Sequence, residues 1–225
     1  VFKTASILTA LEDGFIPDTA NCKVDTGYGI LEMHGAKMRD HNWHNGGYGI
    51  INVSRIIQVS SNIGVSVLID KFYGQNPEKF VEGIHRLGLA TDLKLPFPEY
   101  SAPRIRFPKK DKTGRYWANW SKTALPWMSI GYETQVPPIS TLTFYNAIAN
   151  GGKMVRPRFV TRVEKDGEVV REYPVEVIKE HICGKEALGK IQDILFKVVH
   201  VGLGKTAGSR AFDVSGKTGT AQKAH

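Results

Sequence analysis

The stretch DVSGKTGTAQ, residues 213–222, can be interpreted either as a phosphate-binding loop or as a strand. A glycine, a lysine and a hydroxyl residue in a row are typical of a phosphate-binding loop, but that loop requires G-x-x-x-x-G-K-[ST]. The residue five positions before Gly216 is Ala211, and the second such triplet, at Gly204, has Val199 at the required glycine position. Neither triplet follows a buried strand and begins an amphipathic helix. We therefore exclude a nucleotide-binding loop.

The longer segment AFDVSGKTGTAQ, residues 211–222, is predicted to be a strand, because its residues alternate in character. Successive side chains of a strand point to opposite faces. Lys217 and Gly219 are therefore expected on one face, and Thr218 and Thr220 on the other. Such a strand displays a lysine and two threonine hydroxyls near the end of the chain.

Apolar residues at helical spacing predict six helices before this strand. Asn52 is expected to cap the second helix and Asn76 the fourth. The six helices are expected within residues 2–12, 53–61, 63–73, 77–87, 137–152 and 185–200. In the last two helices, the residues expected to face the core are Leu142, Tyr145, Ile148, Leu188, Ile191, Leu195 and Val198.

The remaining segments are predicted to form strands and loops. Residues 21–50 combine glycines with alternating apolar positions, which is typical of short strands joined by turns. Residues 158–173 alternate on both sides of Asp166-Gly167 and predict a β-hairpin, whereas residues 89–128 are rich in proline and irregular. This combination predicts an α+β fold, in which helices cover an antiparallel sheet and a mostly helical subdomain is attached.

Length and composition are those of a globular protein. The chain has 225 residues, of which 41% are hydrophobic, enough for one large domain or two small ones. It contains neither a signal peptide nor a run of roughly eighteen apolar residues that would span a membrane. Because it begins with Val1 and not with Met, we expect a piece of a longer protein. Two cysteines, Cys22 and Cys183, predict neither a disulfide framework nor a C-x-x-C metal site.

The net charge of +8 is concentrated in one segment. Its cations are Arg104, Arg106, Lys109, Lys110, Lys112, Arg115 and Lys122, against a lone Asp111. A nucleic-acid surface is one interpretation of such a segment, but the sequence fits no known nucleic-acid-binding module. We favour a solvated basic loop that faces an anionic surface or partner, and we expect no nucleic acid.

A pair of histidines, His41 and His44, invites a metal interpretation. No further cluster of cysteine, histidine or carboxylate residues completes a ligand set in the sequence. We therefore predict no metal site.

Three short elements follow one another in a suggestive order. Lys3 lies in the first turn of the first helix, Ser60-Ser61-Asn62 lies at a break between helices, and Lys217-Thr218-Gly219 lies on the late strand. The order S-x-x-K, S-D-N, K-T-G is the signature of penicillin-binding proteins and class A β-lactamases. Lys3 completes the first motif only with a serine immediately before Val1, and we infer that serine.

The wider sequence strengthens this resemblance. Five ordered segments resemble parts of the transpeptidase domain of class B penicillin-binding proteins, and the septal, division-specific type most of all. The segments are VFKTASILTALEDG (1–14), VDTGYG (24–29), QVSSNIGVS (58–66), ISTLTFYNAIANGG (139–152) and SGKTGTAQ (215–222). The resemblance covers nearly the whole chain. It implies a β-lactamase/transpeptidase-like fold whose last strands, after the Lys217 strand, lie outside the sequence.

The chemistry of amide attack explains why the first two motifs belong together. Three residues apart on a helix, a serine and Lys3 project from the same face, so the amine reaches the hydroxyl. To act as a base the amine must be neutral, and burial together with the charge of Lys217 lowers its pKa. The resemblance implies that Lys3 is the general base, alone or paired with Ser60. Ser60 relays a proton, and Asn62 holds the acyl-donor peptide and orients Lys3.

The resemblance also assigns a role to the late strand. Lys217, with the hydroxyls of Thr218 and Thr220, is expected to bind the terminal carboxylate of a D-Ala-D-Ala stem peptide. Gly219 lets the backbone approach the substrate closely. The N–H groups of Thr220 and of the inferred serine are expected to form the oxyanion hole.

Three activities compete within this resemblance. The first is a peptidoglycan D,D-transpeptidase, a target of β-lactams that crosslinks stem peptides through a serine acyl-enzyme. The second is a serine β-lactamase, and the third is a β-lactam sensor that is acylated and signals. The SSN motif at residues 60–62 and the segments quoted above favour the transpeptidase.

The resemblance further implies a location and an organisation. The intact protein is expected to be anchored in the bacterial cytoplasmic membrane with this domain on the periplasmic side, beside a lipid-linked glycan polymerase and division proteins. The resemblance implies no cofactor, and it implies that residues 1–225 are a fragment of a single transpeptidase domain. Residues 15–150 are expected to be its mostly helical part with the SSN motif. Residues 1–14 and 151–225 are expected to be its helix and sheet part, which carries Lys3 and the K-T-G motif.

Overall fold

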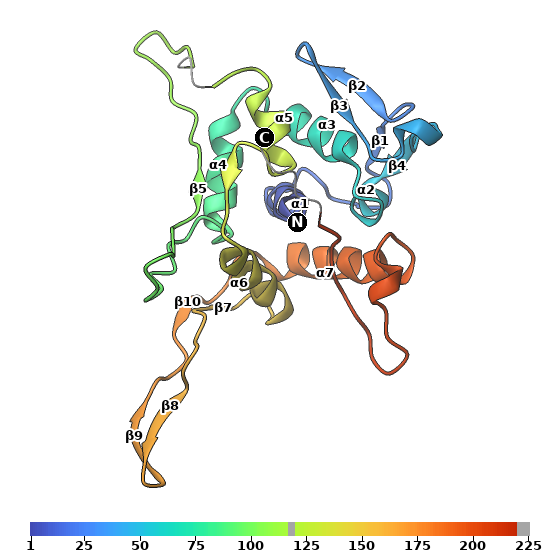
Figure 1. The fold of residues 1–225 in the computed structure, drawn as a ribbon. Helices are drawn as coiled ribbons and strands as arrows, with labels where there is room; N and C mark the ends of the chain where they lie inside the picture. The colour runs from blue at the N-terminus through green and yellow to red at the C-terminus, as the bar shows by residue number, and fades with distance from the viewer. Residues whose placement is uncertain (117–119, 220–225) are drawn as a thin grey trace.

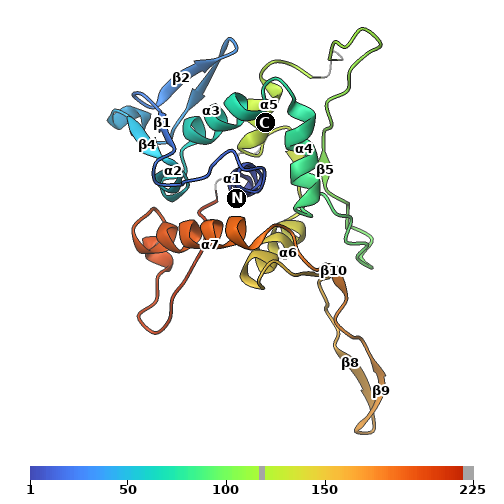
Figure 2. The same ribbon diagram turned by 180° about the vertical axis from the view of Figure 1, so that it is seen from behind.

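Helix α1 (Phe2–Glu12) lies at the centre of the protein, with the other helices arranged around it (Figures 1 and 2). The computed structural model describes residues 1–116 and 120–219. The other helices are α2 (Val53–Gln58), α3 (Asn62–Tyr73), α4 (Pro77–Arg86), α5 (Ala124–Ser129), α6 (Pro138–Ala149), α7 (Lys185–His200) and the short 3₁₀ helices η1 (Trp43–Asn45) and η2 (Lys205–Ala207).

Burial on every side distinguishes α1 from an ordinary surface helix. Its residues 2–11 are all buried, and it packs against α3, α4, α5 and α7. A helix buried all round needs no polar face, but its hydroxyl groups need partners. Ser6 Oγ donates to the Ser129 carbonyl at 2.6 Å, and Thr9 Oγ1 donates to the Ala5 carbonyl at 2.9 Å.

The strands form five two-stranded antiparallel sheets, so the described residues have an α+β fold with small sheets. The pairs are β1 (Lys23–Asp25) with β4 (Ile50–Asn52), β2 (Ile30–Met33) with β3 (Ala36–Arg39), β5 (Arg104–Ile105) with β6 (Thr134–Gln135), β7 (Met154–Val155) with β10 (Val177–Lys179), and β8 (Arg162–Lys165) with β9 (Glu168–Glu172). The single sheet covered by helices that we expected is not formed within residues 1–116 and 120–219.

The prediction of a strand at residues 211–222 was wrong for its described part, residues 211–219, which contain no strand. A strand needs a neighbouring strand to pair its backbone groups. The segment instead runs beside α7, where Gly216 N–H donates to the Leu195 carbonyl at 3.2 Å. Thr220 lies outside the described residues.

The helix predictions were mostly confirmed. Helices α1 and α7 have the expected bounds, and Asn52 caps α2 by accepting a 2.8 Å hydrogen bond from Arg55 N–H. The expected orientation of α6 was wrong in one position, because Leu142 is 61% exposed while Phe144 is buried. Helix α5, which begins within the segment expected to be irregular, was not predicted.

The hairpin β8–β9 turns at Asp166-Gly167, as predicted, with φ values of 52° and 84°. Every residue of both strands is exposed. The hairpin projects from the body of the protein as a separate arm (Figure 1). It therefore adds nothing to the core that positions the candidate site.

Candidate active site

The three predicted motifs meet at the first turn of α1. The chain after η2 runs back to this turn (Figure 1). A Cβ atom on Gly219 would lie 3.5 Å from a methyl group of Val1, so the K-T-G segment touches the start of α1. Ser60 lies between α2 and α3, whose junction faces the same turn through Lys3.

Lys3 and Ser60 are in direct contact. The Lys3 amine donates to the Ser60 carbonyl at 2.6 Å and lies 3.1 Å from Ser60 Oγ. The Lys3 side chain is only 8% exposed. Burial, with a further contribution from the charge of Lys217, lowers the pKa of Lys3 from 10.5 to about 7, against an opposing effect of Asp40. Near neutral pH the amine is therefore able to accept a proton.

Ser60 has an unusual backbone conformation. Its φ of 54° lies in the left-handed region, which costs a residue other than glycine roughly 1–3 kcal/mol. Such a conformation persists only where the surroundings determine it. Here the Ser60 N–H donates to the Ile57 carbonyl at 3.1 Å, and the Ser60 carbonyl accepts from Lys3. The strained turn is what directs Ser60 towards α1.

The second lysine, Lys217, is half-buried beside Thr218. Its amine donates to the Thr218 carbonyl at 3.1 Å and to the Thr218 hydroxyl at 3.0 Å. We expected these two side chains on opposite faces, but the segment is not a strand and the long lysine side chain reaches its neighbour. Burial lowers the pKa of Lys217 from 10.5 to about 8, so the amine stays largely charged at neutral pH.

Asn62 begins helix α3 beside this turn. Its side-chain amide donates to the Arg39 carbonyl at 2.7 Å. Within the described part of the chain the structure records no hydrogen bond between Asn62 and Lys3. Asn62 is thus tied to the end of β3, and its proposed contact with the acyl-donor peptide stays a prediction.

Sequence reasoning missed the residue that holds this turn in place, Asp40. Its carboxylate is 1% exposed and accepts hydrogen bonds from the Ser61 hydroxyl at 2.7 Å and from the Asn62 and Ile63 N–H groups at 2.6 and 3.0 Å. Asp40 stands in a glycine-rich region where an aspartate is an ordinary turn residue. Its role follows from the fold, which places the end of β3 against the start of α3.

The two histidines do not form a metal site within the described residues. His41 Nε2 lies 3.0 Å from the Tyr48 hydroxyl, and the His44 ring packs on Trp43. Residues 1–116 and 120–219 contain no group of three histidine, cysteine, aspartate or glutamate side chains that could hold a metal ion. In the same part of the chain, no helix has both the length and the apolar character needed to cross a bilayer.

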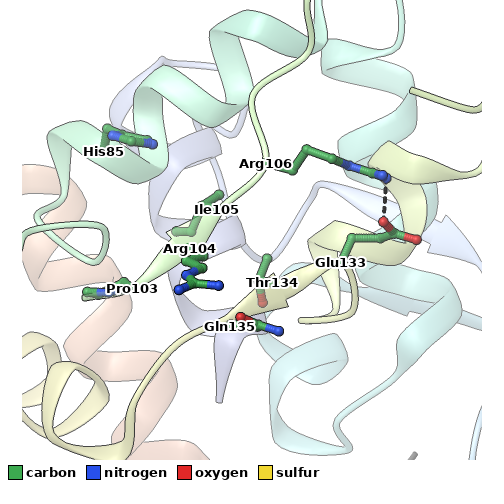
Figure 3. Close-up of a pocket in the computed structure, with 8 residues that line it drawn as sticks. All are labelled: His85, Pro103, Arg104, Ile105, Arg106, Glu133, Thr134 and Gln135. Atoms are coloured by element: carbon green, nitrogen blue, oxygen red, sulfur yellow. Dashed lines mark hydrogen bonds and ion pairs between the residues drawn. The ribbon is translucent and has the colours of Figure 1, made fainter. Parts of the chain in front are cut away.

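A separate cavity of about 660 Å³ lies between α4 and the β5–β6 pair (Figure 3). Its lining includes His85, Arg104 and Gln135, and Arg106 forms an ion pair with Glu133 at its edge. None of the predicted site residues lines it. The candidate site is therefore defined by its side-chain contacts and not by this cavity.

The α+β fold and these contacts define a class of site. In it, a buried lysine whose pKa is lowered to about 7 lies beside a serine hydroxyl, with a second lysine nearby. The family described as the penicillin binding protein transpeptidase domain matches residues 1–225. The chain belongs to this family.

Known relatives are distant in sequence but similar over most of the chain. Penicillin-binding protein PbpB of Mycolicibacterium smegmatis is 26% identical over 99% of this chain and 33% of its own length. The probable peptidoglycan D,D-transpeptidase PenA of Neisseria flavescens is 27% identical over 78% of this chain and 38% of its own length. The chain thus spans about a third of the length of these curated relatives.

Among solved structures, the transpeptidase domain of Burkholderia pseudomallei penicillin-binding protein 3 is similar in fold. It superimposes with a TM-score of 0.77 at 26% identity, covering 99% of this chain and 60% of that one. The transpeptidase fold is therefore shared over almost all of the chain.

Proposed function

We propose that the protein is a peptidoglycan D,D-transpeptidase of the cell-division type, which crosslinks stem peptides through a serine acyl-enzyme and is acylated by β-lactams. The observation that carries this proposal is the Lys3 amine, buried, 3.1 Å from Ser60 Oγ and with a pKa of about 7. Family membership and the D,D-transpeptidase name of one relative support it.

In the acylation step, the nucleophile is the serine inferred immediately before Val1. Neutral Lys3, three residues later on the same face of α1, accepts the hydroxyl proton as the serine oxygen attacks the carbonyl of the penultimate D-Ala. The proton passes through Ser60 to the nitrogen of the terminal D-Ala, and the amide bond breaks. An amine of a second stem peptide then attacks the acyl-enzyme ester, which forms the crosslink and returns the serine hydroxyl.

Substrate recognition is assigned to the K-T-G segment. Protonated Lys217, with the Thr218 and Thr220 hydroxyls, binds the terminal carboxylate of the donor peptide, where an ionised partner strengthens each hydrogen bond. Gly219 keeps the segment free of a side chain next to Val1. The oxyanion is stabilised by the N–H groups of Thr220 and of the nucleophilic serine. Asn62, in the SSN motif, also holds the donor peptide.

The cellular setting is proposed from the family. The intact protein is anchored in the cytoplasmic membrane with this domain outside, and it works next to a lipid-linked glycan polymerase and division proteins. The reaction needs no cofactor, because acyl transfer from an amide uses only the groups named above. Residues 15–150 form the part that carries the SSN motif, and residues 1–14 with 151–225 form the part that carries Lys3 and the K-T-G motif.

Removal of the Lys217 amine tests this proposal. In the full-length protein, Lys217→Ala is expected to lower the rate of crosslinking of D-Ala-D-Ala stem peptides by roughly 10- to 150-fold, the equivalent of about 1.5–3 kcal/mol for hydrogen bonds to a charged group. Lys205→Ala is the matched control, because Lys205 is the exposed lysine of the second G-K-T triplet. Equal rates in both variants would contradict the carboxylate-binding role.

The crosslinking assay, together with incubation of the full-length protein with a penicillin, separates the alternative activities. A transpeptidase forms crosslinks and keeps its penicillin adduct for a long time. Rapid turnover of penicillin without crosslinking would identify a β-lactamase, and stable acylation without crosslinking would identify a sensor.

A further inference from the structure

The Asp40 carboxylate follows directly after β3 and is almost fully buried, at 1% exposure. One of its oxygens accepts from the Ser61 hydroxyl at 2.7 Å. The other accepts from two consecutive backbone N–H groups, those of Asn62 at 2.6 Å and Ile63 at 3.0 Å. A buried carboxylate with three donors is strongly held, because each lost hydrogen bond leaves a buried charge poorly compensated.

These contacts complete the first turn of α3. The first N–H groups of a helix have no partner within the helix. Here Asp40 accepts from the first two, and Ser61 Oγ accepts from Gly64 N–H, the third, at 2.9 Å. A negative charge at this end of α3 is also favoured by the helix dipole. Asp40 therefore fixes where α3 begins.

The start of α3 in turn fixes Ser60, two residues before Asn62. Ser60 adopts a left-handed conformation with φ of 54°, which relaxes unless both of its sides are held. On the side of α3, the hydrogen bonds of Ser61 and Asn62 to Asp40 hold the chain. On the side of α1, the Lys3 amine donates to the Ser60 carbonyl at 2.6 Å.

We infer that Asp40 is a positioning residue of the acyl-transfer site, which holds the turn at Ser60 so that its hydroxyl stays within reach of the Lys3 amine. This inference rests on the function proposed above. Asp40 does not touch the reacting atoms; it acts through the turn. A second consequence is electrostatic, because a buried negative charge close to Lys3 affects the protonation of that amine.

The charges that act on Lys3 have opposite signs. Lys217, in the segment beside the start of α1, lowers the pKa of Lys3 in addition to the effect of burial, whereas Asp40 raises it. Asp40 thus limits the lowering that the other two cause. Loss of the Asp40 charge alone is expected to move the pKa of Lys3 further down.

Three variants of the full-length protein separate position from charge. Asp40→Asn removes the charge and keeps an oxygen that accepts from the α3 N–H groups. Asp40→Ala removes both the charge and all three hydrogen bonds. Ser61→Ala removes one hydrogen bond to Asp40 and the acceptor for Gly64 N–H, and leaves the charge. Asp193→Asn, on the exposed side of α7 and paired with Lys197, is the matched control.

The measurement is the second-order rate constant for acylation by a fluorescent penicillin across pH 5.5–9, with thermal unfolding of each variant as a check of folding. In Asp40→Asn, the rise of the rate with pH is expected to move to lower pH. In Asp40→Ala and Ser61→Ala, the maximal rate is expected to fall roughly tenfold or more. Of these two variants, only Asp40→Ala is also expected to shift the rise of the rate to lower pH. Asp193→Asn is expected to behave as the wild type.

Two results would overturn the inference. The first is that the acylation rate of folded Asp40→Asn rises at the same pH as that of the wild type. The second is a wild-type maximal rate in folded Asp40→Ala or Ser61→Ala. Should Asp40→Ala fail to fold, the other two variants decide. Failure of the wild type to acylate would instead refute the proposed function. In that case the pKa of Lys3, measured by NMR in Asp40→Asn and in the wild type, still tests the electrostatic effect, which equal values would disprove.

Discussion

At the scale of single residues, Lys3 combines two properties that normally exclude each other, an ionisable amine and almost complete burial. Burial favours the neutral form, and the Lys217 charge adds to this effect. Because the unfolded chain binds this proton up to a pKa of 10.5 and the folded chain only up to about 7, folding stability rises with pH between these values. The proposed base for acyl transfer is thus kept at a cost in stability at neutral pH.

The two lysines together predict a bell-shaped dependence of the acylation rate on pH. The rate is expected to rise through about pH 7, as Lys3 loses its proton, and to fall above about pH 8, as Lys217 loses the charge that binds the carboxylate. Because the two amines interact, the two apparent pKa values of this profile belong to the pair and not to either lysine alone. Stopped-flow acylation with a penicillin measures the profile.

Lys217→Arg provides the control for the alkaline limb. An arginine keeps its charge over the whole range, so the fall above about pH 8 is expected to disappear even where the overall rate is lower. A rate that continues to rise to pH 9.5 in the wild type would contradict the assignment of Lys217.

Motif order and spacing predicted Lys3, Ser60 and Lys217 as site residues; the structure places Lys3 against Ser60, and the roles of all three stay predictions. Motif order and spacing did not identify Asp40, whose importance depends on a contact between the end of β3 and the start of α3 that no local pattern encodes. The contact between Lys217 and Thr218 was missed for a related reason: strand alternation was applied to a segment without a strand partner.

At the scale of elements, amphipathic helices were predicted well and segments of uniform character were not. Helix α7 has one apolar face, and the four residues predicted to face the core, Leu188, Ile191, Leu195 and Val198, are all buried. Helix α6 is apolar on several sides, and periodicity alone did not show that Leu142 faces solvent while Phe144 faces the core. The strand expected at residues 211–222 depended on sheet neighbours that local alternation does not reveal.

Two helical glycines are predicted to respond in opposite ways to alanine. A Cβ atom on Gly83 in α4 would clash with Thr9 Cγ2 in α1, so Gly83→Ala is expected to destabilise the protein by about 1–3 kcal/mol. Gly189 in α7 has no atom within 4 Å of that position, so Gly189→Ala is expected to stabilise it by about 0.5–1 kcal/mol through helix propensity.

Denaturant unfolding of both variants, followed by circular dichroism, measures this difference. If Gly83→Ala were as stable as Gly189→Ala, the close packing of α4 on α1 would be wrong.

At the scale of the whole molecule, the site exists only in the folded chain. Lys3, Ser60 and Lys217 are far apart in sequence and meet because the central helix α1 presents its first turn to the α2–α3 junction and to the segment after η2 (Figure 1). In the described part of the basic segment, two cations, Arg106 and Lys110, pair with Glu133 and Glu78. Its expected anionic partner stays a prediction.

The most direct test of the proposed function is peptide mapping by mass spectrometry of the full-length protein after incubation with a penicillin. We predict an acyl adduct on a serine immediately before Val1, formed faster at pH 7.5 than at pH 5.5 and lost slowly. This result would identify the nucleophile, and it would support both the position of Lys3 three residues after it and the acyl-transfer chemistry. No adduct, or an adduct on another residue such as Ser60, would contradict the assignment of Lys3 as the base.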